Sequence, residues 1–296
     1  MSPELKSSSL KIRANSLKLV RTFFEERNVL EVDTPILSKY GPIDAHIDLL
    51  EVALSKDSKG FLHSSPEYGM KKLLALGLGD IYQLGHVFRK DETGPLHSVE
   101  FTMIEWYKIN TSFEEFLQDN LALVRLFVGE IESEVLSYSK AFKLAVGAPL
   151  DSPKKKLMEQ GKALGFDFHD EEDIINLLWG CVVEPTLGKE KITVITHFPK
   201  DQAALAQIKN GFAERFEFYV NGIELGNGYH ELTDPIEQKL RLEKANEERA
   251  LLGKPSFQID PDLISALEMG LPDCYGIALG FDRLLMLKEN RSSIHL

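Results

Sequence analysis

The chain of 296 residues is long enough for one large domain or two ordinary ones. Hydrophobic residues make up 43 % of it and the formal net charge is −12, which supports a substantial core and disfavours broad binding of RNA or DNA. No stretch reaches the roughly 18 apolar residues of a membrane span, and Cys181 and Cys274 stand far apart in no metal spacing. We therefore predict a cytoplasmic protein with reduced thiols and no membrane contact.

The first half of the chain carries clear helix and strand signals. In order, they predict a helix over 10–27, a strand over VLEVDTPIL (29–37), a helix over 66–77, strands over 81–89 and 98–108, and a helix from 113 into the 130s. Pro35 restricts the first strand to a sheet edge or a strand end, because proline donates no backbone hydrogen bond. Ser65 and Pro66 predict the N-cap and first residue of the second helix, and Ser112 with Glu115 forms a capping-box pattern before the third.

The second half returns to strands after a mixed, charged stretch. In order, it predicts a small, mainly helical insertion at about 137–190, strands over 191–198 and within 213–232, helices that begin at Pro235 and Pro261, and a strand that turns into a helix within GIALGFDRLLML (276–287). Asn221-Gly222 is a strong hairpin signal, and Asp234 is a suitable N-cap for the helix after it. Hairpin strands flanked by helices indicate an α+β fold with a mainly antiparallel sheet. We predict one such domain over 1–296, which contains the insertion.

The stretch VFRKDETGPLHSVEFTMIEWY (87–107) places charged side chains among strand-forming residues. The period of two in a strand puts Phe101, Glu105 and Tyr107 on one face, and Arg89 would join them if the two strands pair. Burying a lone carboxylate costs several kcal/mol, roughly, unless a cation or good donors meet it. Glu105 therefore needs a positive partner. One alternative is that a lysine or arginine of the protein supplies it and that the face lies open to solvent.

A second group of acids lies in IELGNGYHEL (223–232). Strict strand alternation places Glu224 and Glu231 on opposite faces, but a bulge in Gly226–Gly228 would reset the register. Paired carboxylates suit Mg²⁺, which prefers oxygen ligands and shares them with phosphates. The alternative is that both acids are simply exposed.

A third group lies in GIALGFDRLLML (276–287). Gly276 and Gly280 would let the backbone approach a ligand closely, and Arg283 falls in the first turn of the helix that follows. An arginine near a helix N-terminus is unfavourable for the helix dipole, and an anionic ligand would relieve this. The alternative is a pair of packing glycines with a surface arginine.

Together these stretches resemble the three signature motifs of class II aminoacyl-tRNA synthetases. VLEVDTPIL is similar to motif 1, the stretch 87–107 to motif 2 and the stretch 276–287 to motif 3, and IELGNGYHELTD resembles the lysine-specific branch. The motif 1 helix begins near residue 10, so we expect no anticodon-binding domain of about 50 residues or more before it. In this respect the chain resembles the elongation factor P–(R)-β-lysine ligase family, which is related to lysyl-tRNA synthetases. Ala278 supports that branch, because the tRNA-charging enzymes carry glycine there.

The resemblance implies roles in binding ATP and Mg²⁺. Arg89 and Arg283 are implied as the catalytic arginines, with Arg89 on the α-phosphate and the substrate carboxylate and Phe101 stacked on adenine. The remaining nucleotide positions that the resemblance implies are Asp91, which is one methylene shorter than the family's usual glutamate, His97, Glu224 and Gly280. Glu224 and Glu231 are implied as the Mg²⁺ ligands.

The resemblance also implies a pocket for lysine or β-lysine. Glu67 would bind the backbone amine, and Glu105 with Tyr107 would receive the side-chain ammonium, so that the missing cation is the substrate. Glu231 and Ala278 complete the implied pocket. In the pocket floor, one methyl group at Ala278 changes which amino-acid backbone fits by about 1–3 kcal/mol.

These roles imply an ATP-dependent, AMP-forming ligase that attaches the amino acid to a lysine side chain of elongation factor P. A homodimer through the motif 1 region is implied by the resemblance alone, and tRNA is disfavoured as a partner by the net charge. Two alternatives stay open: a minimal lysyl-tRNA synthetase-like enzyme that charges tRNA, and a non-catalytic module that binds amino acids or tRNA.

Overall fold

A computed structural model describes residues 3–166 and 173–295 of the chain. The chain forms two compact units, of which the first comprises Met1–Gly129 and His230–Leu296 and the second Glu130–Tyr229. The prediction of one domain with an insertion at about 137–190 stays a prediction.

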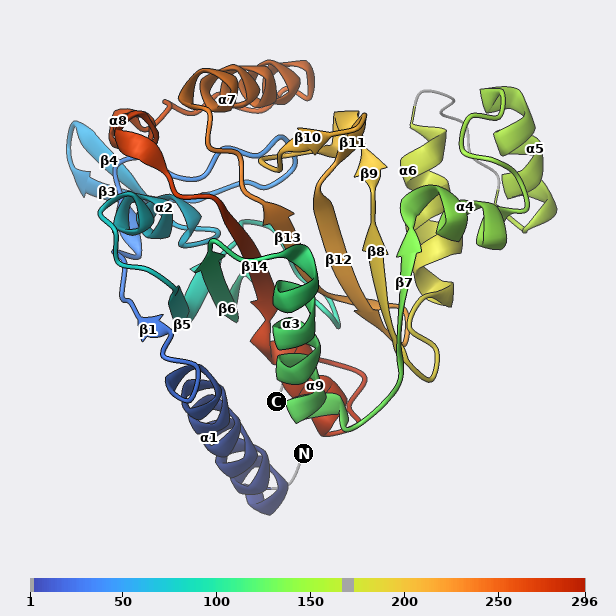
Figure 1. The fold of residues 1–296 in the computed structure, drawn as a ribbon, viewed down its shortest axis with the longest axis horizontal. Helices are drawn as coiled ribbons and strands as arrows, with labels where there is room; N and C mark the ends of the chain where they lie inside the picture. Colours follow the sequence, from blue (N-terminus) through green and yellow to red (C-terminus); the bar gives the residue numbers. More distant parts are fainter. Residues whose placement is uncertain (1–2, 167–172, 296) are drawn as a thin grey trace. The chain divides into compact units, whose positions relative to one another are not determined.

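The first unit is built on a sheet that contains the strands β1 (Leu30–Glu31), β5 (Ile81–Phe88), β6 (Glu100–Ile109) and β14 (Cys274–Gly280) (Figure 1). Strand β6 pairs antiparallel with β5 on one side and with β14 on the other, and β1 joins β5 in parallel. The strands predicted over 81–89 and 98–108 do pair, which is the condition for their side chains to share one face. Gln83 lies opposite Glu105, so their side chains share one face of the sheet.

The strand predicted over VLEVDTPIL (29–37) is wrong in its extent. Only Leu30–Glu31 (β1) and Leu37–Ser38 (β2) form strands in this stretch, and they belong to different sheets. Strand β1 pairs with β5. Strand β2 pairs with β4 (Ser58–Leu62), which in turn pairs with β3 (Leu50–Ser55). The chain leaves the ladder before Pro35, where the imide nitrogen has no hydrogen to donate.

Six helices accompany these strands in the described part of the first unit: α1 (Pro3–Glu25), α2 (Glu67–Ala75), α3 (Phe113–Val128), α7 (Pro235–Leu251), α8 (Pro261–Gly270) and α9 (Phe281–Lys288). The capping box of Ser112 and Glu115 is confirmed, and so is the Asp234 cap, whose Oδ1 accepts from two backbone N–H groups of α7. Helix α1 begins earlier than predicted, α3 ends before the 130s, and α2 begins at Glu67 with Pro66 at its N-cap. Ser65 still accepts the Glu67 N–H at 3.0 Å.

Aromatic residues join α1 and α3 to one face of this sheet. Phe24 of α1 stacks on Tyr82 of β5 at 4.2 Å, and Trp106 of β6 stacks on Phe116 of α3 at 4.5 Å between ring centroids. Successive strand residues point to opposite faces, so Glu105, which precedes Trp106, points away from this aromatic core. The apolar face therefore anchors the strands, while the other face is left for polar side chains.

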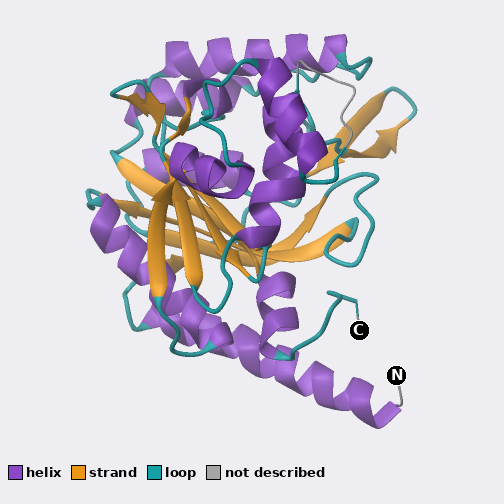
Figure 2. Cartoon of the chain, turned by 90° about the vertical axis from the view of Figure 1, so that its right-hand side faces the viewer, coloured by secondary structure: helices purple, strands orange, loops and turns teal. Residues whose placement is uncertain are grey.

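The beginning of α1 and the end of α9 lie on the same side of the first unit in both ribbon views (Figures 1 and 2). Ser9 of α1 donates a hydrogen bond to the Glu289 carboxylate at 2.7 Å. Arg13 is also paired with Asp282 of α9. These contacts fix α9, and with it the motif 3 region, to the first helix of the chain.

The second unit contains its own strands and most of the predicted helical stretch. Strand β12 (Arg215–Val220) pairs antiparallel with β8 (Ile192–Thr196) and with β13 (Ile223–His230), and β7 (Ser133–Ser137) joins β8 in parallel. The predicted Asn221-Gly222 hairpin is confirmed, and both residues have positive φ, 54° and 75°, as a type I′ turn requires. A small sheet of β9 (Phe198–Pro199), β11 (Phe212–Ala213) and β10 (Ile208–Lys209) completes its strands.

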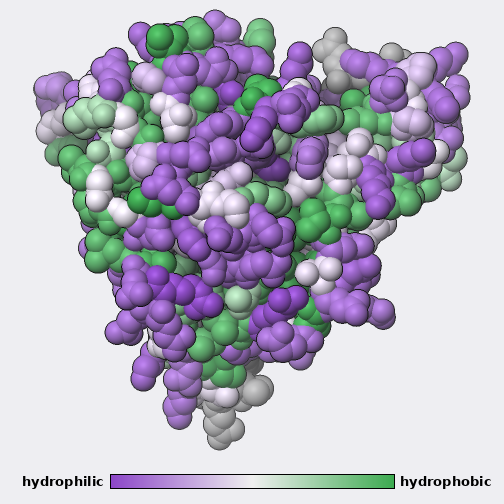
Figure 3. All heavy atoms as spheres, in the orientation of Figure 1, coloured by the Kyte–Doolittle hydropathy of each residue, from purple (hydrophilic) through white to green (hydrophobic). Residues whose placement is uncertain are grey.

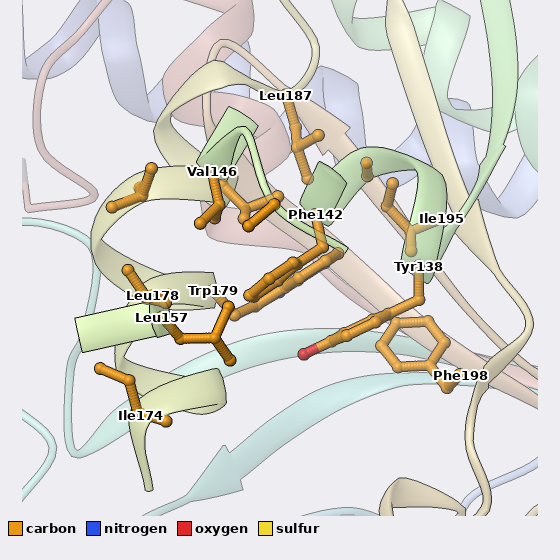
Figure 4. Packing of buried hydrophobic residues seen from close by; sticks show 14 of the residues in the cluster. Tyr138, Phe142, Val146, Leu157, Ile174, Leu178, Trp179, Leu187, Ile195 and Phe198 are labelled. Carbon is orange, nitrogen blue, oxygen red and sulfur yellow. The ribbon is translucent and has the colours of Figure 1, made fainter. Parts of the chain in front are cut away.

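Helices of the second unit surround a compact core (Figure 4). They are α4 (Tyr138–Val146), α5 (Lys154–Ala163), α6 (Ile174–Leu178), a π-helical turn (Trp179–Val183) and a 3₁₀ turn (Glu184–Thr186). Tyr138 and Trp179 stack at 3.8 Å between ring centroids, and Phe198 packs against them. Most of the described residues of 137–190 are therefore helical, and the prediction that they form an insertion stays a prediction.

Hydrophilic residues cover much of the face shown in Figure 3, with hydrophobic residues dispersed among them. Of the helices in the described part of the chain, none is long and apolar enough to span a membrane.

Candidate active site

Glu105 lies on the polar face of the sheet and is only 2 % exposed. Its two carboxylate oxygens each accept one hydroxyl hydrogen bond of 2.7 Å, one from Ser65 and one from Tyr107. No lysine or arginine in the described ranges forms an ion pair with it. Burial, followed by the nearby charge of Glu67, raises the pKa of Glu105 to about 8. The alternative from the sequence, in which a lysine or arginine of the protein pairs with Glu105 on a face open to solvent, therefore does not describe this carboxylate.

A buried lysine, which the sequence interpretation missed, lies among the neighbouring acids. Lys71 of α2 is 1 % exposed, and its Nζ lies 2.6 Å from Glu67 and 2.7 Å from Glu231. The two carboxylates hold the pKa of Lys71 above its ordinary value although burial alone would lower it. Glu67 and Lys71 are one helical turn apart, which is the one sequence signal that would have suggested their pairing.

Strand β14 pairs with β6 and brings two further residues next to Tyr107 and Glu105. Gly276 lies opposite Tyr107 and Ala278 lies opposite Glu105 in the β14–β6 ladder. A Cβ atom at Gly276 would come within 2.4 Å of both the Glu231 carboxylate and the Tyr107 ring, so only glycine fits there. The groups that approach Gly276 are thus side chains of the protein, as the alternative of a packing glycine expects, and a close approach to a ligand there stays a prediction.

Arg89, which follows β5, lies close to Phe101, which is near the beginning of β6. The Arg89 guanidinium lies 5.2 Å from the centroid of the Phe101 ring, and one of its terminal nitrogens is 3.7 Å from the Glu92 carboxylate. The Nε of Arg89 is buried, and it has no hydrogen-bond partner within residues 3–166 and 173–295. A buried donor without an acceptor is costly, so an anionic ligand such as a phosphate or carboxylate would fit at this arginine.

Arg283 of α9 forms hydrogen bonds with the loop between β5 and β6. Its Nε donates to the Leu96 carbonyl at 3.2 Å, and Nη2 lies 2.9 Å from Nε2 of His97. Asp91, in the same loop, is exposed and has a left-handed φ of 63°. Gly280 caps α9 and has room for a Cβ, since its nearest neighbour would be the Arg283 side chain at 3.6 Å. The motif 2 loop and the motif 3 helix are thus in direct contact, while the nucleotide roles of these residues remain predictions.

Glu224 belongs to the second unit and is half-buried on β13. The predicted bulge exists, but it falls at Leu225 rather than within Gly226–Gly228, because Phe218 pairs with Gly226 while Tyr219 pairs with Glu224. Within the described ranges, no group of three or more histidine, cysteine or acidic residues is arranged to hold a metal ion. The carboxylates of Glu224 and Glu231 are of the donor type that Mg²⁺ prefers, and their role as its ligands stays a prediction.

The comparisons with known proteins agree with the arrangement of motifs. The family of class II tRNA synthetases (D, K and N) matches residues 2–296, and the chain belongs to this family. It is 42 % identical over 305 residues to the elongation factor P–(R)-β-lysine ligase of Pasteurella multocida (strain Pm70), with 99 % of this chain and 94 % of that protein covered. The ligase of the same name from Mannheimia succiniciproducens is 41 % identical over 304 residues, with 99 % and 94 % covered. That of Haemophilus influenzae (strain PittGG) is 40 % identical over 297 residues, with 96 % and 92 % covered.

Proposed function

We propose that this protein is an ATP-dependent ligase that activates (R)-β-lysine, or lysine, and transfers it to a lysine side chain of elongation factor P. Relatives of this name align with almost the whole chain. The observation that carries the proposal is the buried Glu105 carboxylate, which accepts from Ser65 and Tyr107 and has no cationic partner among the described residues. A side-chain ammonium of the substrate is the group that this position lacks.

The pocket around Glu105 favours a substrate with a positively charged end. Because burial raises its pKa to about 8, Glu105 holds a proton near neutral pH in the empty site. An incoming ammonium stabilises the ionised form, so binding would release this proton. Glu67, whose side chain is 16 % exposed, would receive the backbone amine, and Arg89 would take the carboxylate.

The first chemical step joins the amino acid to AMP. A carboxylate oxygen of the substrate attacks the α-phosphorus of ATP, the bond to the bridging oxygen breaks, and pyrophosphate leaves. Arg89 would orient the carboxylate and the α-phosphate, Phe101 would carry the adenine, and Arg283 with His97 would meet the outer phosphates. Asp91 and Gly280 would complete the nucleotide site. Mg²⁺, held by Glu224 and Glu231, would neutralise charge on the phosphates.

In the second step the acyl group moves to the acceptor. The neutral amine of a lysine side chain of elongation factor P attacks the acyl carbon, an amide bond forms, and AMP leaves with the bonding electron pair. A chain with a net charge of −12 would attract a basic acceptor loop, and this would raise the rate of encounter.

Two further features belong to this proposal. Exposed apolar side chains occur in the helix and strand of the motif 1 region, where the proposed homodimer would form: Leu10, Leu30, Ile36 and Leu37. An interface between two copies would cover such residues. Cys181 and Cys274 are free thiols, which fits the reducing conditions of the cytoplasm.

The exchange of labelled pyrophosphate into ATP tests the first step. We expect exchange that depends on both Mg²⁺ and (R)-β-lysine or lysine, and none with norleucine, which lacks the side-chain ammonium. Exchange that is absent, or indifferent to that ammonium, would refute the proposal. Formation of acid-precipitable lysyl-tRNA would instead favour a tRNA-charging enzyme, and failure to bind ATP with Mg²⁺ would favour a non-catalytic module.

A further inference from the structure

We propose that Lys71 is a positioning residue of the amino-acid pocket, which ties Glu67 to Glu231 and holds Glu67 in place for the backbone amine of the diamino acid. This inference rests on the proposed function. The ammonium group of Lys71 lies 2.6 Å from Glu67 and 2.7 Å from Glu231. A lysine in such a place is rare in proteins, since lysine is almost never fully buried unless it is paired.

The surroundings of Lys71 connect it to the substrate-binding face. Gly276 lies against both the Glu231 carboxylate and the Tyr107 ring, and the Tyr107 hydroxyl donates to Glu105. On the other side, Ser65 joins Glu105 to the first residue of α2, because its hydroxyl donates to Glu105 and accepts the Glu67 N–H. Lys71 is therefore part of a continuous cluster and not an isolated ion pair.

The chemistry of this cluster suits the proposed substrate. The Lys71 ammonium forms ion pairs with Glu67 and Glu231, whereas the Glu105 carboxylate accepts from the hydroxyl groups of Ser65 and Tyr107. Charges in a buried site are tolerated when they are paired, so an ammonium group of the diamino acid would pair with the carboxylate that Lys71 does not reach.

Lys71 also fixes positions. Without its ammonium, the half-buried carboxylate of Glu67 and the buried carboxylate of Glu231 would repel each other and move apart. Glu67 would then lose the orientation needed to meet the backbone amine of the substrate. Lys71 itself need not touch the substrate to have this effect.

The test compares Lys71→Met, whose side chain keeps a similar length without charge, with two matched variants. Lys71→Arg keeps the positive charge, and Lys72→Met removes the neighbouring cation on α2, which pairs with Asp260 at 2.5 Å outside the cluster. Binding of (R)-β-lysine and of ATP is measured by calorimetry, and kcat and KM are measured by pyrophosphate exchange.

We expect Lys71→Met to weaken binding of the diamino acid at least about ten-fold, to raise its KM more than it lowers kcat, and to lower ATP affinity much less, by way of Glu231 as a proposed Mg²⁺ ligand. Lys71→Arg should recover part of the loss, and Lys72→Met should bind the diamino acid as the unchanged protein does, even if its melting temperature falls. Equal losses of diamino-acid and ATP affinity in Lys71→Met, or no loss at all, would overturn the inference.

If Lys71→Met does not fold, the folding of the double variant Lys71→Met/Glu231→Gln tests the role of Lys71 instead, because this variant removes one charge of each sign. Recovery of folding in the double variant supports a charge-balancing role, and failure of both variants to fold contradicts it. The failure of the underlying function is seen separately, since the unchanged protein would then bind no diamino acid.

Discussion

Ala278 of β14 lies directly opposite Glu105 of β6 in the central ladder of the first unit. Its methyl group therefore borders the position proposed for the substrate's side-chain ammonium. Ala278→Gly should enlarge the pocket and shift the preference between (R)-β-lysine and lysine by about 1–3 kcal/mol, or about ten-fold to two-hundred-fold. The measurement is the ratio of kcat/KM for the two amino acids in pyrophosphate exchange. Ala53→Gly, in the separate strand β3, is the control and should leave the ratio as it is.

Glu105→Gln should weaken binding of the diamino acid by about 2–5 kcal/mol, because the substrate ammonium would lose its charged partner in a buried site. The glutamine amide can still bond to Ser65 and Tyr107, so the pocket should keep its shape. Calorimetric titration with (R)-β-lysine and with ATP separates the two effects. An unchanged preference for lysine-like over neutral amino acids would contradict the role of Glu105.

Stability without substrate should depend on pH through Glu105. Its pKa of about 8 in the folded protein exceeds the ordinary value of 4.5, so the folded state holds the proton more tightly than the unfolded state does. The contribution to stability is full below about pH 4.5 and is lost as pH rises toward 8. Between pH 6 and pH 8 the free energy of unfolding should fall by about 2 kcal/mol more in the unchanged protein than in Glu105→Gln. Urea unfolding at both pH values measures this, and parallel pH profiles for the two proteins would contradict it.

Arg89→Lys should reduce activation of the amino acid by about a hundred-fold, which corresponds to roughly 3 kcal/mol. A lysine lacks the planar fork that binds phosphate or carboxylate with two hydrogen bonds, and it lacks the Nε donor that is buried without a partner in the described structure. The measurement is kcat/KM in pyrophosphate exchange. Arg21→Lys, at the exposed pair with Glu31, is the control. Comparable activity in the two variants would argue against a role for Arg89 in the reaction.

Local sequence signals predicted much of the fold. The capping box of Ser112 and Glu115 and the Asn221-Gly222 hairpin depend on neighbouring residues, and both are confirmed. The strand over 29–37 failed because its two ends pair with strands of different sheets, which is a long-range choice. The bulge fell at Leu225 because its position depends on the register with β12, which the sequence does not reveal.

The site was predictable where it follows strand alternation, and not where it depends on distant partners. Glu105 and Tyr107 share a face by period two, and β6 confirms this. Lys71 was missed because its second partner, Glu231, follows β13 much later in the chain. Ser65 was interpreted only as a helix cap, although its hydroxyl also donates to Glu105.

The most direct test of the proposed function is mass spectrometry of elongation factor P after incubation with this protein, ATP, Mg²⁺ and (R)-β-lysine. We expect that one lysyl unit is added to a single lysine side chain, and that Glu105→Gln strongly reduces the yield. Elongation factor P that keeps its mass, while the same preparation catalyses exchange of pyrophosphate with (R)-β-lysine, would show that the acceptor is wrong. An unmodified acceptor together with no exchange would contradict the ligase itself.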